Sequence, residues 1–173
     1  MSERRSRRWV TGVPRATLGS DRLSRVSAIS REQLLAYVRE ERYAVEASIT
    51  ADGVPQAAVV GVVVTDAFEI VFDTVQTSRK ARNLRQQARV ALVFGSTAAA
   101  ASRTIQIEGT ADEPSGAELD ALLECYFAAF PDGRQRRLSG NLTYFRVKPS
   151  WIRCSDYGTV PPTIVEFAES ELS

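Results

Sequence analysis

Three side chains that can bind an anion follow one another at Ser78, Arg79 and Lys80. An apolar stretch ends at Asp73 just before them, and the polar residues 77–88 that come next are compatible with a helix. The first turn of a helix has free backbone N–H groups and the positive end of the helix dipole, so it favours phosphate. A hydroxyl, a guanidinium and an ammonium at this point predict a phosphate site. The alternative is an exposed basic helix in which Ser78 is an ordinary N-cap.

Lysine is rare in this sequence, which makes its positions informative. Of the 22 lysines and arginines, only Lys80 and Lys148 are lysines. A composition that uses arginine almost everywhere else favours a specific role for the lysine that stands in the candidate phosphate site.

The sequence contains no histidine, and this excludes several classes of enzyme. A Ser-His-Asp triad, a Cys-His dyad and a histidine general base are all impossible. Zinc, non-heme iron and histidine-ligated heme sites are not expected either. Any chemistry must therefore come from a bound cofactor, or from Tyr, Lys, Arg and carboxylate side chains.

Composition predicts one folded domain with a charged extension. The 173 residues are 44% hydrophobic, which is enough for a single core. Residues 1–28 carry seven arginines and two acids, so they sum to +5 and the rest to −4, within a formal net charge of +1. We expect residues 1–28 to form a basic, disordered arm and residues 29–173 to form the domain with its C-terminal tail. Two well-separated cysteines and the lack of a long apolar run predict a cytoplasmic protein without membrane contact.

Hydrophobic periodicity predicts a chain of hairpin-linked strands with a few helices. Ser30 and Gln33 form a capping-box pattern at a helix start, and Asp52-Gly53 is typical of a hairpin turn. The predicted strands are 43–49, 56–65, 68–73, 89–95, 103–111 and a sixth over 142–154 with a proline interruption, and the predicted helices are 31–41, 77–88 and 115–130. This order favours an antiparallel α+β barrel. The valine-rich strand 56–65 is expected to be buried on both faces, as in a barrel or a dimer interface.

The segment around the candidate phosphate site resembles the signature of a known family. Residues 72–84 read F-D-T-x-x-x-S-R-K-A-x-N-L and are followed by R-V-A-L-V-F. Together they resemble the central signature of the pyridoxamine 5′-phosphate oxidase-like family. The motifs D-G-x-P at 52–55, I-E-G-T-A at 107–111 and F-x-V-x-P-x-W-I at 145–152 resemble its other strands, so the resemblance covers about residues 30–157. It implies a six-stranded split β-barrel with flanking helices that forms a homodimer, with two FMN sites at the interface.

The resemblance also implies roles for individual residues. In the family, the Thr, Ser, Arg and Lys of the central motif hold the FMN phosphate. The second strand lies along the isoalloxazine ring, and a later core strand begins with a glutamine near the ring. The cofactor-binding residues that we expect are Thr74, Ser78, Arg79 and Lys80, with Asp73 beside them, Val59 and Val60 along the ring, and Thr104 and Gln106 near it.

Several family residues have no counterpart here. Ala58 stands where the true oxidase has an arginine that contacts FMN, and Val63 replaces a lysine that binds the substrate phosphate. Thr104 replaces the ring-proximal glutamine, and the C-terminal arginine-histidine element is missing because the chain has no histidine. We therefore expect the cofactor half of the site to be kept, and we do not expect oxidation of pyridoxamine phosphate.

Three functional hypotheses follow. The first is an FMN-dependent oxidoreductase that exchanges a hydride or electrons with a small organic substrate, with its catalytic residues unassigned. The second is a deazaflavin-dependent reductase on the same fold, because a deazaflavin also carries a phosphate on its ribityl arm. The third is a flavin-binding sensor or carrier without enzymatic activity, which could use the arm of residues 1–28 to contact a polyanion. We do not expect this arm to bind nucleic acid.

Overall fold

The computed structural model describes residues 29–95 and 102–172. Its strands are β1 (Tyr43–Ile49), β2 (Pro55–Val64), β3 (Ile70–Val75), β4 (Arg89–Gly95), β5 (Arg103–Asp112), β6 (Leu142–Asp156) and β7 (Thr163–Ala168). Its helices are α1 (Arg31–Glu40), α2 (Arg79–Gln86), α3 (Gly116–Ala129), α4 (Gly133–Arg137) and the short 3-10 helix η1 (Glu169–Glu171). The predicted basic arm of residues 1–28 lies outside the described residues and stays a prediction.

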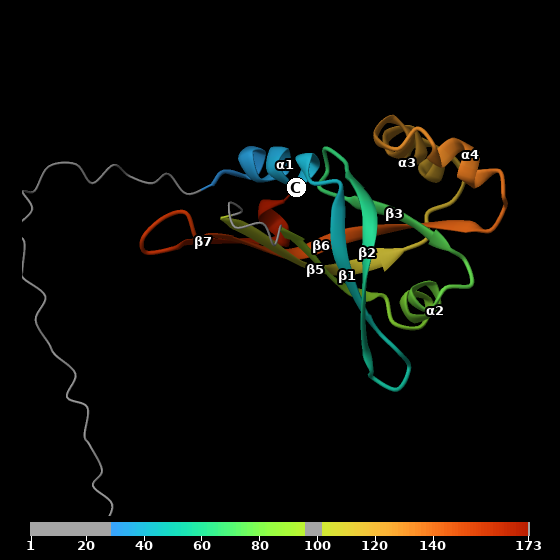
Figure 1. Cartoon of the computed structure of the whole chain (residues 1–173), viewed down its shortest axis with the longest axis horizontal. Helices are drawn as coiled ribbons and strands as arrows, with labels where there is room; N and C mark the ends of the chain where they lie inside the picture. Colours follow the sequence, from blue (N-terminus) through green and yellow to red (C-terminus); the bar gives the residue numbers. More distant parts are fainter. Residues whose placement is uncertain (1–28, 96–101, 173) are drawn as a thin grey trace, which may run out of the picture.

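The strands form one antiparallel sheet that closes on itself. The order is β3-β2-β1-β4-β5-β6-β7, and a further pairing of β3 with β6 joins the first six strands into a barrel. Figure 1 shows the barrel from the side, with α1 above it and α2 below it. The prediction of a six-stranded antiparallel α+β barrel is confirmed.

Two parts of the C-terminal third differ from the sequence-based expectation. Residues 163–168, expected in the tail, form β7, which pairs with the second half of β6. β6 itself runs unbroken through Pro149. The register of its pairing with β5 shifts between Glu108 and Gly109, and this irregularity accommodates Pro149, which has no N–H to donate. The helix α4 also forms where no element is predicted.

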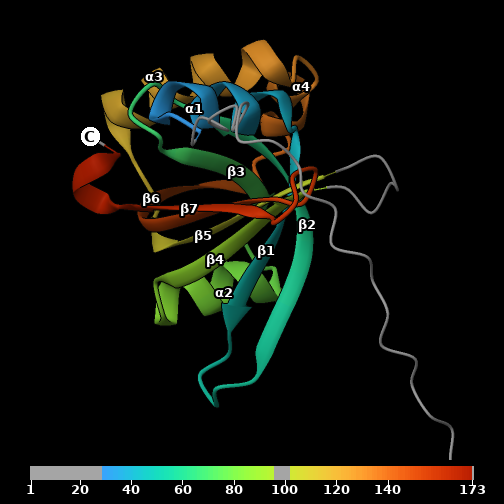
Figure 2. The ribbon, with the colours of Figure 1, turned by 90° about the vertical axis from the view of Figure 1, so that its left-hand side faces the viewer.

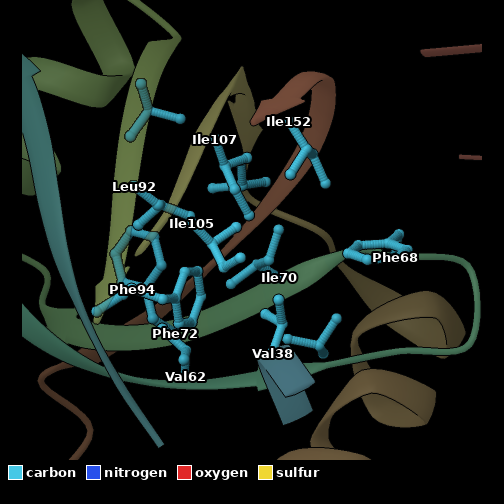
Figure 3. Close-up of a cluster of buried hydrophobic side chains, with 14 of the residues drawn as sticks. Val38, Val62, Phe68, Ile70, Phe72, Leu92, Phe94, Ile105, Ile107 and Ile152 are labelled. Carbon is cyan, nitrogen blue, oxygen red and sulfur yellow. The ribbon is translucent and has the colours of Figure 1, made fainter. Parts of the chain in front are cut away.

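The core has two parts, one on each side of the barrel wall. The inner part fills the barrel with aliphatic and aromatic side chains from all six strands, as Figure 3 shows around Phe72, Phe94 and Ile107. The outer part lies between α3 and the wall, where Tyr126 and Phe127 pack on Val63 and Tyr144. The end of β2 is thus buried on both faces, as the valine run predicts. Its beginning is not, because the outward side chain of Val59 is 68% exposed.

Two helices close opposite ends of the barrel (Figure 2). α1 inserts Leu34 and Val38 into the inner core, after the predicted capping box of Ser30 and Gln33. α2 inserts Ala81 and Leu84 at the other end. No described helix is long and apolar enough to cross a membrane.

We predict that Gly109→Ala destabilises the fold through the β5–β6 irregularity. A Cβ at Gly109 would lie 2.5 Å from the Lys148 carbonyl oxygen and 3.0 Å from a methyl carbon of Val147. The backbone at Lys148 cannot move without disturbing the strand pairing, so overpacking should lower the free energy of unfolding by about 1–3 kcal/mol. Urea unfolding measures this cost. Ser150→Ala is the control at the same place, and it should change stability by less than about 0.5 kcal/mol; equal effects of the two changes would contradict the prediction.

Candidate cofactor-binding site

The loop between β3 and α2 presents hydroxyl groups and free amides at one end of the barrel. The Ser78 hydroxyl lies 3.1 Å from the Thr74 hydroxyl and accepts a hydrogen bond of 3.1 Å from the backbone N–H of Ala81. Ser78 is therefore the N-cap of α2, which agrees with the phosphate site and also with the alternative of an ordinary basic helix. The amides of Arg79 and Lys80 precede the first intrahelical bond, so they remain available as donors.

Arg79 is held between α2 and the start of β2. With the amide of Gln56 turned so that its oxygen faces Arg79, this oxygen lies 3.0–3.1 Å from the three guanidinium nitrogens. The Gln56 nitrogen then lies 2.8 Å from the side-chain nitrogen of Asn83, which is buried one turn further along α2, so these two amides form a hydrogen bond when the Asn83 amide is turned to present its oxygen. The contact ties Arg79, in the first turn of the helix, to β2.

A buried acid lies beneath this group of cations. Glu46 in β1 is only 1% exposed, and one of its carboxylate oxygens has no hydrogen-bond partner. Burial raises the pKa of Glu46 above its usual range, while Ser48 and the charge of Lys80 act in the opposite direction. Glu46 and Lys80 thus attract one another, although no contact within 4.0 Å joins them.

The alternation of β3 separates two of the predicted site residues. Thr74 turns towards Ser78, whereas the carboxylate of the preceding residue, Asp73, bonds Arg136 in α4 at 2.8 Å. Neighbouring residues in a strand point to opposite faces. Burial, and then the charge of Asp73, raises the pKa of the Tyr126 hydroxyl well above its usual value. The side chain of Asp73 therefore lies on the α3–α4 side of the wall, away from the predicted phosphate-binding residues.

The other predicted residues lie along the wall of the barrel. Directly paired residues place Val59, Val45, Val93 and Gln106 in one row across four neighbouring strands, on the outer face. Thr104 shares the face of Gln106 two residues away and is half-buried. Val60, by contrast, points into the inner core. The structure thus places Val59 and Gln106 in the same row of the outer face. Val60 can contribute only its backbone to a cofactor site on that face.

A groove opens where β1 and β4 separate. Their pairing covers only Val45–Ala47 and Ala91–Val93. Beyond it lies a groove of about 540 Å³, whose polar lining includes Ser48, Arg89 and Glu108. Ser48 also approaches Asn83, at 3.4 Å, so the groove borders the polar group beneath α2.

Sequence patterns alone do not single out Glu46, Gln56 or Asn83. The signal for Glu46 is present, because strict alternation places Ala44, Glu46 and Ser48 on the inward face of one strand. Asn83 is one of the residues that the motif quoted above specifies, and in this structure its side chain contacts that of Gln56.

Comparison with known proteins gives the family. Residues 30–155 match the family described as Pyridoxamine 5′-phosphate oxidase. The chain belongs to this family. Comparison with curated proteins gives no match.

Solved structures share the fold at low sequence identity. A heme binding protein from Mycobacterium smegmatis has a TM-score of 0.71 and 18% identity over 87% of this chain. A pyridoxamine 5′-phosphate oxidase-related, FMN binding protein from Nostoc punctiforme has a TM-score of 0.56 and 13% identity, and the alignment covers 80% of this chain and 92% of that one. The conserved hypothetical protein Rv2991 from Mycobacterium tuberculosis has a TM-score of 0.61 and 21% identity, with 75% and 86% covered. The chain spans 61% of the length of the M. smegmatis protein.

The raised pKa of Glu46 predicts a pH-dependent effect of Glu46→Gln on stability. A carboxyl group whose folded-state pKa is raised stabilises the protein below its unfolded-state pKa of about 4.3, and this contribution is lost as the pH rises through the folded-state pKa. Glutamine stays neutral, so the melting temperature of the variant relative to wild type should be higher at pH 8 than at pH 5. Circular dichroism melts measure it. Glu40→Gln, at an exposed position in α1, is the control, and an identical offset at both pH values for Glu46→Gln would contradict the prediction.

Proposed function

We propose that this protein binds FMN through its phosphate at the start of α2, and uses it to exchange a hydride or electrons with a small organic substrate. The observation that supports this most directly is the donor set formed by Ser78, Arg79, Lys80 and Thr74 at a helix N-terminus. The family assignment supports the same reading.

The residues present fit a phosphate group well. The first turn of α2 and the loop before it carry two free amides, the hydroxyl groups of Ser78 and Thr74, and the side chains of Arg79 and Lys80. A phosphate dianion accepts hydrogen bonds from all of these, and charge-assisted bonds to Arg and Lys are the strongest among them. Gln56 braces Arg79 from the side, so the cation is already in place before an anion arrives.

The row on the outer wall fits an aromatic ring. Val59, Val45 and Val93 offer an exposed apolar strip, and the amide of Gln106 and hydroxyl of Thr104 stand at its end. Bound FMN supplies redox chemistry that needs no protein nucleophile, which suits a chain without histidine. The protein's own part is to bind the phosphate, orient the ring and exclude water.

Heme and deazaflavin fit the residues less well. The chain has no histidine to ligate a heme iron, although a structural neighbour is a heme binding protein. A deazaflavin would share the phosphate site, but its long acidic tail calls for a basic groove. The charged residues that line the groove beside the site are one arginine and one glutamate, Arg89 and Glu108. Their charges offset each other, so the groove is not basic and FMN is favoured.

The proposal includes a homodimer. Tyr43, Val45, Val59 and Val93 are all exposed on the outer wall, and together they form an apolar strip on neighbouring strands. A strip of this kind is typical of an interaction surface. A second copy of the chain would cover the strip and enclose the ring site between two walls.

Lys80→Ala should weaken FMN binding. Loss of one charge-assisted hydrogen bond to phosphate costs about 1.5–3 kcal/mol, which is roughly a tenfold to hundredfold rise in the dissociation constant. Quenching of flavin fluorescence measures the affinity.

Lys148→Ala is the matched control, because Lys148 is the other lysine of the chain and is exposed on β6. It should change the affinity by less than about twofold. Equal losses in the two variants would show a diffuse electrostatic attraction in place of a phosphate site.

Val59→Glu should dissociate the dimer. A charge on the apolar strip would be desolvated at the interface without a partner, which costs several kcal/mol. Light scattering coupled to size exclusion gives the mass. Val160→Glu, at a position that is 99% exposed in the β6–β7 turn, should leave the mass unchanged. A wild-type protein that is monomeric at micromolar concentration would refute the dimer.

A further inference from the structure

Glu46 is an unusual residue in its place. It lies on β1 directly opposite Ala58 of β2 and Leu92 of β4, on the inward face of the barrel wall. It is almost completely buried, and one carboxylate oxygen is unpartnered. A charge in such a place costs far more than the apolar side chain that a core position normally holds. The cost calls for a functional reason.

The groups that face Glu46 come from three directions. Its own strand contributes the Ser48 hydroxyl, and β2 and β4 contribute the uncharged side chains of Ala58 and Leu92. α2 contributes Lys80, the one charge that acts on Glu46 among the described residues. Nearby Gln56 contacts Arg79 and Asn83, and the amides of Gln56 and Asn83 carry no charge. Burial is the main cause of the raised pKa of Glu46, and Lys80 is the charged group whose compensation of Glu46 a bound anion would weaken.

We propose that Glu46 makes phosphate binding at the start of α2 proton-coupled, so that the site takes up a proton as it takes up the anion. This inference rests on the proposed function, in which that site holds the phosphate of FMN. With the site empty, Lys80 partly compensates the Glu46 carboxylate. When a phosphate arrives, it engages Lys80 and adds negative charge beside the acid, so Glu46 accepts a proton from solvent and becomes a neutral carboxyl group. Glu46 is thus a positioning residue that acts through Lys80.

The sign of the pH dependence follows from linkage. Phosphate binding raises the pKa of Glu46 above its value in the free protein, so the complex holds more protons than the free protein. Affinity for FMN is then highest at low pH, falls between the two pKa values, and is constant above them. Riboflavin has no phosphate, and its affinity should not follow this curve.

The test is the FMN affinity of the full-length protein between pH 5.5 and 8.5, in wild type and in Glu46→Gln. Wild type should lose at least about fivefold more affinity across this range than the variant. The ionisation of FMN itself affects the affinity of both proteins equally, so it cancels when their pH curves are compared. Riboflavin is titrated in parallel, and Glu40→Gln is the matched control that should follow wild type.

A calorimetric measurement on wild type keeps the test decisive if Glu46→Gln fails to fold. At pH 7.5 the phosphate of FMN is already doubly charged, because its second pKa is about 6. FMN binding enthalpies in buffers of different ionisation enthalpy should then show net proton uptake, and riboflavin should show none. Zero uptake, or the same pH curve in wild type and Glu46→Gln, would overturn the inference while leaving FMN binding intact. Failure of wild type to bind FMN at any pH would overturn the proposed function, and the inference with it.

Discussion

The candidate site depends on the way α2 closes one end of the barrel. Ala81 and Leu84 enter the inner core, and this fixes the rotation of the helix about its axis. Arg79, Lys80 and Asn83 must then face β1 and β2, where Gln56 joins the helix to the strand. The free amides of the first turn open at the same place. Apolar packing thus orients a polar site, because the two buried aliphatic side chains set the face of α2 from which Arg79 and Lys80 project.

The alternation of apolar residues was enough to predict the barrel, because hairpin-linked strands with one buried face leave few other solutions. The N-cap at Ser78 follows from residue type in the same way. β7 was not predictable, because the six residues 163–168 pair only with the far half of β6 and add few side chains to the core. Asp73 shows a different limit. A motif places it beside Thr74 in sequence, but the strand turns the two side chains to opposite faces, where Arg136 becomes the partner of Asp73.

The barrel contains two groups of buried charged residues, and they differ in how well their members are partnered. Arg146 of β6 is buried on the outer side and forms ion pairs with three acids, Asp112, Glu69 and Glu118, so this cluster joins β6 to β5, to α3 and to the residue before β3. Beneath α2 the partners are incomplete, since Glu46 has an unpartnered oxygen and no acid of the described residues forms an ion pair with Lys80. A structural ion cluster satisfies its members, whereas a binding site keeps donors free for a ligand. The contrast within one chain supports a ligand at the start of α2.

A crystal structure of the full-length protein grown with FMN tests the central claim most directly. The phosphate should lie at the first turn of α2, within hydrogen-bond distance of Ser78, Arg79 and Lys80, with the flavin ring against the wall that carries Val59 and Gln106. A phosphate bound elsewhere, with the first turn of α2 facing only solvent, would contradict the claim.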